Sequence, residues 1–411
     1  MKEKAEYCLG CINEPCSKAC PLENDIPNFI KCIKENRLED AYHVLTQNTV
    51  LTSICGRICP HDKQCQGSCT RRFKGDPVSI GELEAYIGDL SIRKNWTIPI
   101  KERINKKVAV IGSGPSSLTC ANFLYRNGID VTIYEKYDKL GGILNHSIPD
   151  FRLDKDIVEE TINKIIKGIN IKYNMELGKN FSLEDIIDEY DYIYLGIGSN
   201  ISNDLNIPGE ELNGVIGGNE LLEKKLDIDF EDKTIIVNGG GNVAMDVARY
   251  IKRKNPHKVI VVYRRSENEM PAEKKEIADA KNENIEFLFK TNILSINGDN
   301  KVEEISAIHT ELVEKENERP YPVNVEGTNF NVKCDYVIKA IGSSFDKKII
   351  NKLNIETKNG LIVVDEKQKT SNDKVYAGGD LTNQKRTIAW AARSGRNAAE
   401  AIIEKINEVS W

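Results

Sequence analysis

Short apolar runs and helical patterns alternate over most of the chain. Residues 107–136, "KVAVIGSGPSSLTCANFLYRNGIDVTIYEK", predict a strand from Val108 to Ile111, a glycine turn, a helix and a second strand that ends at Glu135. The same order recurs over residues 233–265, "KTIIVNGGGNVAMDVARYIKRKNPHKVIVVYRR". Strands that alternate with helices in this way are typical of α/β domains with a parallel sheet.

Two further apolar runs flank the second of these units. They are "YIYLGIGS" (residues 192–199) and "YVIKAIGSS" (residues 336–344), and each predicts a strand that ends in a glycine turn. Near the C-terminus, "VYAGGDLTNQKRTIAWAARSGRNAAEAI" indicates a strand, a turn with Asp380 and a helix from about Thr387. This symmetry predicts one nucleotide-binding domain inserted into another, with the chain crossing over near each "IGS".

Composition and charge exclude several classes of protein. Of the 411 residues, 40% are hydrophobic and 29% are charged, as in ordinary globular proteins. The net charge is -6 and basic residues are spread along the chain, so we expect no nucleic-acid partner. The chain lacks an apolar run of about 18 residues and an apolar signal region at its start, so we expect a cytoplasmic protein with no membrane span.

The cysteines are concentrated at one end of the chain. Nine of the eleven lie in the first 69 residues, mostly in two runs, "CLGCINEPCSKACP" and "CGRICPHDKQCQGSC". The cytoplasm keeps thiols reduced, which favours metal or redox chemistry over disulfides. Cys32, Cys120 and Cys334 lie in amphipathic or apolar segments, and we expect them to be buried thiols.

The cysteine spacing favours iron–sulfur clusters over zinc. Zinc sites typically use close Cys-x2-Cys pairs. Here two, four and three residues separate the cysteines of the first run, and three, five and three those of the second. A Cys-x2-Cys followed by staggered cysteines and a Cys-Pro end is closer to the bacterial ferredoxin run, in which the last cysteine serves the other of two clusters. No Cys-x2-Cys lies in the rest of the chain, which disfavours a redox-active disulfide.

The two glycine turns predict two dinucleotide sites. In the first, Gly112 and Gly114 would let the backbone approach a pyrophosphate at a helix N-terminus, and Glu135 can bind ribose hydroxyls. In the second, the strand is followed by Arg264 and Arg265 in place of an acid. Guanidinium groups suit a 2′-phosphate, which predicts NADPH in preference to NADH; the alternative is a solvated strand end.

Taken together, these motifs make the chain resemble the small (beta) subunit family of NADPH-dependent glutamate synthase. The relatives of this family include the flavin subunits of electron-bifurcating NADPH:ferredoxin oxidoreductases and the N-terminal part of dihydropyrimidine dehydrogenase. The resemblance covers essentially the whole chain and is carried by "CINEPCSKACP", "CGRICPHDKQCQGSC", "PVSIGELE", "GSGPSSL", "GGILNHSIPDFRL", "GGGNVAMDVAR", "VVYRRSENEMPA" and "YAGGD".

The resemblance implies an α/β fold with two nested dinucleotide-binding, glutathione-reductase-like domains preceded by a helical iron–sulfur domain. It implies a helical domain with two [4Fe-4S] clusters over residues 1–100, an FAD domain over 101–206 and 340–411, and an inserted NADPH domain over 207–339. It also implies crossed ligation, in which Cys55 is not a ligand. One cluster would be held by Cys8, Cys11, Cys16 and Cys69, and the other by Cys20, Cys59, Cys65 and Glu84.

The resemblance further implies which residues bind the two nucleotides. For FAD they are Gly112, Gly114, Pro115, Ser117, Glu135, Gly141, Gly142, Gly379, Asp380 and Thr387. For NADPH they are Gly239, Gly241, Asn242, Ala244, Arg264 and Arg265. The chain departs from the family at Ser117, where relatives usually carry Gly or Ala, and in the loop "NHS". We expect His146 to be a loop histidine in solvent; the alternative is a position near the flavin.

The function expected from these features is the transfer of electrons from NADPH through FAD and the clusters to a larger partner subunit. A flavin accepts two electrons together and releases them singly, whereas an iron–sulfur cluster takes one at a time. The favoured partner is a glutamate synthase large subunit. The alternatives are a flavin subunit for another acceptor, such as one in a bifurcating complex, and a non-catalytic FAD-binding scaffold.

Overall fold

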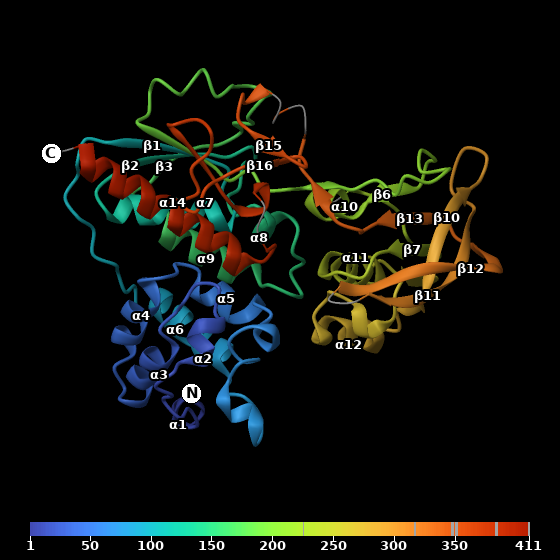
Figure 1. Ribbon diagram of the computed structural model, residues 1–411, viewed down its shortest axis with the longest axis horizontal. Helices are drawn as coiled ribbons and strands as arrows, with labels where there is room; N and C mark the ends of the chain where they lie inside the picture. Colours follow the sequence, from blue (N-terminus) through green and yellow to red (C-terminus); the bar gives the residue numbers. More distant parts are fainter. Residues whose placement is uncertain (225, 316–317, 347–348, 350–351, 383–384, 410–411) are drawn as a thin grey trace. The chain divides into compact units, whose positions relative to one another are not determined.

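The computed structural model describes residues 1–224, 226–315, 318–346, 349, 352–382 and 385–409. They form two compact units, one of residues 1–145, 150–198 and 346–411 and the other of residues 146–149 and 199–345 (Figure 1). The second unit is therefore an insertion in the first, which confirms the predicted nested fold. The domain limits proposed for each cofactor remain predictions, because the two compact units are defined by contacts within the chain and not by contacts with a cofactor.

The first unit begins with short helices that surround the cysteines. They are α1 (Lys2–Glu6), α2 (Pro15–Ala19), α3 (Ile26–Lys34), α4 (Leu38–Thr46), α5 (Thr52–Ile58) and α6 (Ile80–Arg93). Asp25 is the N-cap residue of helix α3, and its carboxylate accepts from Asn28 N at 3.2 Å. The helix buries an apolar face that includes Phe29. Its amphipathic pattern and the burial of Cys32 agree with the sequence analysis.

Helices α5 and α6 approach each other closely because glycines line their contact. A Cβ at Gly56 would lie 2.9 Å from Ala85 Cα, a distance that side chains do not tolerate. Helix α5 ends at Cys59, its C-cap residue, and α6 carries Glu84. The glycine contact therefore brings a cysteine of the second run beside the carboxyl of "PVSIGELE".

A five-stranded parallel sheet follows in the same unit. Its order is β17-β4-β1-β2-β3, with β1 (Lys107–Ile111) at the centre, β2 (Asp130–Tyr134), β3 (Asn170–Lys172), β4 (Tyr192–Leu195) and β17 (Val375–Ala377). Helices α7 (Pro115–Arg126) and α14 (Ile388–Val409) lie side by side in this unit (Figure 1). Helix α9 (Lys155–Ile165) belongs to the same unit, as does α8 (Ile143–His146) except for its last residue. The carboxyl ends of the central strands lead directly into the glycine turns of the first site.

The inserted unit repeats this architecture. Its parallel sheet has the order β6-β13-β7-β8-β9, formed by β6 (Val215–Gly217), β7 (Thr234–Asn238), β8 (Lys258–Tyr263), β9 (Glu286–Phe289) and β13 (Tyr336–Lys339). Its helices are α10 (Gly218–Lys224), α11 (Asn242–Lys252) and α12 (Lys274–Asn282). The sheet and α11 enclose an apolar core.

One element of the inserted unit was not predicted from the sequence. Strands β10 (Thr291–Asn297), β11 (Glu304–Lys315) and β12 (Glu318–Lys333) form an antiparallel sheet, and its two long strands, β11 and β12, are the long orange ribbons in Figure 1. Its two long strands are mostly half-buried or exposed and carry many charged residues. They therefore lack the continuous apolar runs that reveal buried parallel strands. Among the described residues, no helix is both long enough and apolar enough to span a membrane.

Candidate functional site

The first glycine turn joins β1 to α7 in a conformation that only glycine adopts easily. Gly112 has φ +92°, and a Cβ there would lie 2.6 Å from Gly196 O. Gly114 is the N-cap of α7, Pro115 occupies the first helical position, and space is open where a Gly114 Cβ would point. The turn therefore leaves the N-terminus of α7 accessible to a phosphate at the predicted position.

A buried hydrogen-bond chain connects this turn to the acid and to the second glycine pair. Glu135 directly follows β2, and its carboxylate accepts from Ser113 Oγ. The same Ser113 Oγ accepts from Gly141 N at 2.9 Å. A Cβ at Gly142 would lie 2.9 Å from Gly114 Cα. The structure thus brings together three segments that the sequence analysis assigned to FAD from separate motifs.

Ser117, at the position where the resemblance leads us to expect Gly or Ala, is matched by Gly196, which directly follows β4. It is fully buried in α7, and its hydroxyl donates to Gly196 O at 3.3 Å. A Cβ at Gly196 would penetrate the Ser117 hydroxyl. The departure at position 117 therefore fits the fold because residue 196 has no side chain.

The C-terminal part of the site depends on a polar cluster that the sequence analysis missed. Gly379, at φ +70°, donates its N–H to Ser394 Oγ at 2.8 Å, and Ser116 Oγ hydrogen-bonds both Ser394 and Tyr194. Burial raises the pKa of the Tyr194 hydroxyl. Isolated serines in helical patterns give no sequence signal for such a cluster, because the partners come from α7, β4 and α14.

The other two predicted FAD residues of this segment lie on either side of a short gap in the described chain. Asp380 lies in the turn after β17, and burial raises the pKa of its carboxyl while Arg386 acts in the opposite direction. Thr387 precedes α14, and its Oγ1 accepts from Trp390 N at 3.3 Å, as a helix N-cap does. Their contacts with FAD remain predictions.

The second glycine turn joins β7 to α11 in the inserted unit. Gly239 has φ +154°, Gly241 is the N-cap of α11, and Ala244 is fully buried in that helix. Asn242 Oδ1 accepts from Glu273 N at 2.9 Å, so the start of α12 is tied to the turn. The Ala in the third position allows α11 to pack against the sheet as the dinucleotide fold requires.

The two arginines follow β8 but are held differently. Arg264 is exposed, and its carbonyl accepts from Thr310 Oγ1 at 2.8 Å. Arg265 is half-buried, and its Nε donates to Pro320 O at 2.9 Å, which fixes the side chain against β12. Two guanidinium groups at this strand end supply the positive charge that a 2′-phosphate requires.

Four cysteines from the two runs line one pocket. They are Cys8, Cys11, Cys16 and Cys69. Burial, with added repulsion from Cys8 and Cys69, raises the pKa of the Cys16 thiol to about 11. The last cysteine of the second run therefore lies with three cysteines of the first run, in the grouping that the resemblance implies for one cluster.

The remaining predicted ligands form a second group. Burial and the nearby Glu84 raise the pKa of the Cys20 thiol to about 12, and burial with Cys20 and Glu84 raises the pKa of Cys65. The pKa of Cys59 is raised by a hydrogen bond with the Cys55 thiol, by burial and by charges that include Glu84. Glu84 is only 6% exposed, and burial raises the pKa of its carboxyl to about 8.

This donor set fits an iron–sulfur cluster. A buried carboxyl beside three buried or half-buried thiols is costly unless a cation or a proton neutralises it. Within the described residues, no three His, Cys, Asp or Glu side chains converge on one point as a single metal ion requires. Each cysteine of a [4Fe-4S] cluster binds a different iron, so such ligands surround a cluster without meeting at a point. Cys55 is also buried beside this group.

The loop "NHS" differs from the expectation. Residues up to His146 form the short helix α8, and His146 is half-buried, so it is not a loop histidine in open solvent. The glycine pair before it allows this turn: Gly141 and Gly142 both have positive φ, and Leu144 N donates to Gly141 O at 3.1 Å.

Two family models match the chain. Residues 106–398 match the pyridine nucleotide-disulphide oxidoreductase family, and residues 1–96 match the 4Fe-4S cluster domain, domain II, of dihydropyrimidine dehydrogenase. The NADPH-bound FprA from Mycobacterium tuberculosis is similar in fold, with a TM-score of 0.65 and 18% identity over 74% of this chain and 85% of that chain. These matches confirm the fold class.

Curated relatives cover nearly the whole chain. The glutamate synthase [NADPH] small chain of Escherichia coli (strain K12) is 33% identical over 98% of this chain and 90% of its own length. The NADP(+)-dependent formate dehydrogenase subunit beta of Moorella thermoacetica is 32% identical over 97% of this chain and 60% of its own length. The resemblance stated from the sequence motifs is therefore confirmed.

The fit between Ser117 and Gly196 predicts a rescue. Gly196→Ala should destabilise the first unit by about 1–3 kcal/mol, because the new methyl group penetrates the Ser117 hydroxyl. Adding Ser117→Ala removes that hydroxyl, and most of the stability should return. Denaturant unfolding of the single and double variants measures the coupling; purely additive effects would contradict the proposed fit.

The second cysteine group predicts different roles for Glu84 and Cys55. Glu84→Ala should remove or alter one cluster, because the variant has no oxygen ligand at this position, whereas Cys55→Ala should leave both clusters in place. Glu82→Ala, at an exposed position of the same helix, is the matched control. Iron content and electron paramagnetic resonance (EPR) of the reduced proteins decide. Loss of a cluster in Cys55→Ala with none in Glu84→Ala would reverse the assignment.

Proposed function

Because the chain belongs to the family of glutamate synthase small chains, within the pyridine nucleotide-disulphide oxidoreductases, we propose that it is an electron-input subunit. It oxidises NADPH and delivers electrons through FAD and two [4Fe-4S] clusters to a larger redox subunit, in first place a glutamate synthase large subunit. The observation that carries this proposal is the separation of eight candidate ligands into two groups within the unit that also holds the FAD-type glycine turn.

The chain's own residues bind and orient the cofactors in this proposal. The α7 N-terminus at Gly114 faces the pyrophosphate, and Glu135, held by Ser113, accepts from ribose hydroxyls. Arg264 and Arg265 bind the 2′-phosphate of NADPH. When bound, FAD converts the two-electron oxidation of NADPH into the one-electron steps that clusters accept.

A second candidate function keeps this chemistry and changes the partner. The formate dehydrogenase subunit described above matches 97% of this chain, but this chain covers only 60% of that subunit. A relative with another named reaction therefore matches nearly the whole of this chain. A non-catalytic scaffold is disfavoured, because a scaffold would not need the second glycine turn with both arginines. Purification of the native complex distinguishes the partners, since the large subunit identifies the reaction.

The cofactor content is the first test. The protein purified without oxygen should contain one FAD and about eight irons per chain, four for each cluster. Metal analysis and visible absorption measure both. Tightly bound zinc with no cluster absorption would refute the iron–sulfur assignment, and about four irons would reduce it to one cluster.

Coenzyme preference is the second test. The double variant Arg264→Ala, Arg265→Ala should bind NADPH more weakly, by about tenfold to a hundredfold for each charge-assisted hydrogen bond that it cannot form. Its affinity for NADH should change little, because NADH lacks the phosphate. Lys258→Ala, which removes a positive charge at the opposite end of β8, is the control. Stopped-flow reduction of bound FAD by each coenzyme gives the affinities. Equal affinities for both coenzymes in the unmodified protein would contradict the NADPH assignment.

A further inference from the structure

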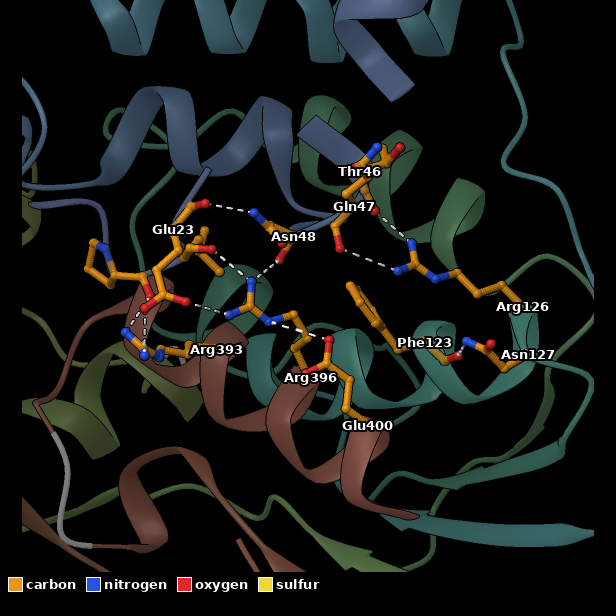
Figure 2. Close-up of polar contacts among 12 residues, drawn as sticks. Glu23, Thr46, Gln47, Asn48, Phe123, Arg126, Asn127, Arg393, Arg396 and Glu400 are labelled. Atoms are coloured by element: carbon orange, nitrogen blue, oxygen red, sulfur yellow. Dashed lines mark hydrogen bonds and ion pairs between the residues drawn. The ribbon is translucent and has the colours of Figure 1, made fainter. Parts of the chain in front are cut away.

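Three arginines of the α/β part of the first unit donate to main-chain carbonyls of the cysteine-bearing part. Arg126, from α7, donates to Thr46 O at 2.6 Å and Gln47 O at 3.5 Å. Arg393 and Arg396, from α14, donate to Pro21 O at 3.2 Å and Leu22 O at 2.7 Å. Figure 2 shows the three guanidinium groups pointing from their helices toward these carbonyls.

Arg396 is the most enclosed of the three. Only 5% of the residue is exposed, and its guanidinium also donates to Asn48 O at 3.3 Å and lies 3.5 Å from the Glu23 carboxylate. Its Nε, 3.9 Å from Glu400, has no hydrogen-bond partner among the described residues. A guanidinium group buried with one N–H unsatisfied costs stability, which its hydrogen bonds to Leu22 and Asn48 offset in part.

The segment that Arg396 holds carries or contacts two candidate cluster ligands. Glu23 N donates to Cys20 O at 2.9 Å, and Asn24 Nδ2 donates to Glu84 Oε1 at 3.5 Å. Glu23 has φ +56°, an unusual conformation for a residue with a side chain, and its carbonyl accepts from Asn48 at 2.7 Å. The backbone of residues 20–24 is thus fixed from outside, and Arg396 supplies one of the contacts.

The guanidinium of Arg396 lies against the segment that follows Cys20. It donates to Leu22 O at 2.7 Å, two residues after Cys20, and Asn24 in the same segment donates to Glu84. Arginine stays protonated in proteins, and charges interact more strongly when they are shielded from water. The positive charge against this segment is therefore permanent.

We propose that Arg396 is a positioning residue for the cluster held by Cys20, Cys59, Cys65 and Glu84, and that its charge sets the reduction potential of that cluster. The inference rests on the proposed function, since it requires a cluster at this group. Reduction adds one negative charge to a cluster, and a fixed positive charge against the segment that carries one of its ligands stabilises the reduced form. Arg396 thereby makes this cluster a better electron acceptor.

The same helix reaches the flavin side of the unit. Ser394, two residues before Arg396, accepts from Gly379 N in the turn assigned to FAD. Helix α14 therefore holds the Cys20 segment through Arg396 and the Gly379 turn through Ser394. Arg396 belongs to the element that contacts both cofactor sites.

The test is a potentiometric titration followed by EPR on the intact purified chain, with FAD and iron content measured first. Arg396→Gln should lower the potential of one cluster and leave the other unchanged. Arg396→Lys keeps the charge and should retain most of the potential. Glu23→Gln removes a negative charge from the same segment and should raise the potential of the same cluster. Because the Glu23 side chain is 55% exposed, this variant tests the charge effect even if Arg396→Gln does not fold.

Arg126→Gln is the matched control, because it removes a similar contact with main-chain carbonyls at residues 46 and 47. It should lower the unfolding temperature without moving either potential. Equal shifts in Arg396→Gln and Arg396→Lys, or a shift in the same direction for Glu23→Gln, would overturn the proposal. Absence of iron from the unmodified chain would instead refute the proposed function.

Discussion

The first unit depends on the close packing of segments that are distant in sequence around buried thiols and one buried carboxyl. Burying such groups together is costly unless a cation or a proton neutralises them. The fold brings these groups together across α5 and α6, where Gly56 permits contact with Ala85. Without that contact, Glu84 on α6 would not reach the thiols at the end of α5.

The flavin side shows the same dependence on contact between helices and strands. Ser117 is accommodated because Gly196 has no side chain, and Glu135 is oriented because Ser113 links it to Gly141. These contacts connect β1, β2, β4 and the loop before α8. A nucleotide bound there would meet groups whose positions are already determined by their neighbours, which reduces the ordering cost of binding.

Polar contacts join the helical part and the α/β part of the first unit. Arg126, Arg393 and Arg396 donate to main-chain carbonyls near the ends of α4 and in the segment after Cys20 (Figure 2). Carbonyls at helix ends and in turns lack partners within their own element, so cationic side chains from a neighbouring helix satisfy them. The junction thus also places fixed positive charge against the segment that follows Cys20.

The sequence alone determined the local features. The strand–turn–helix units at Gly112 and Gly239, the nested order and the two cysteine runs are visible because each occupies a few consecutive residues with a strong conformational or chemical preference. Only the tertiary structure decided which groups meet. It matched Ser117 with Gly196, joined Ser116 to Ser394, and placed Arg396 against the segment after Cys20. Such contacts join residues tens to hundreds of positions apart, and they form only once helices and sheets have packed. A pattern of neighbouring residues therefore cannot predict them.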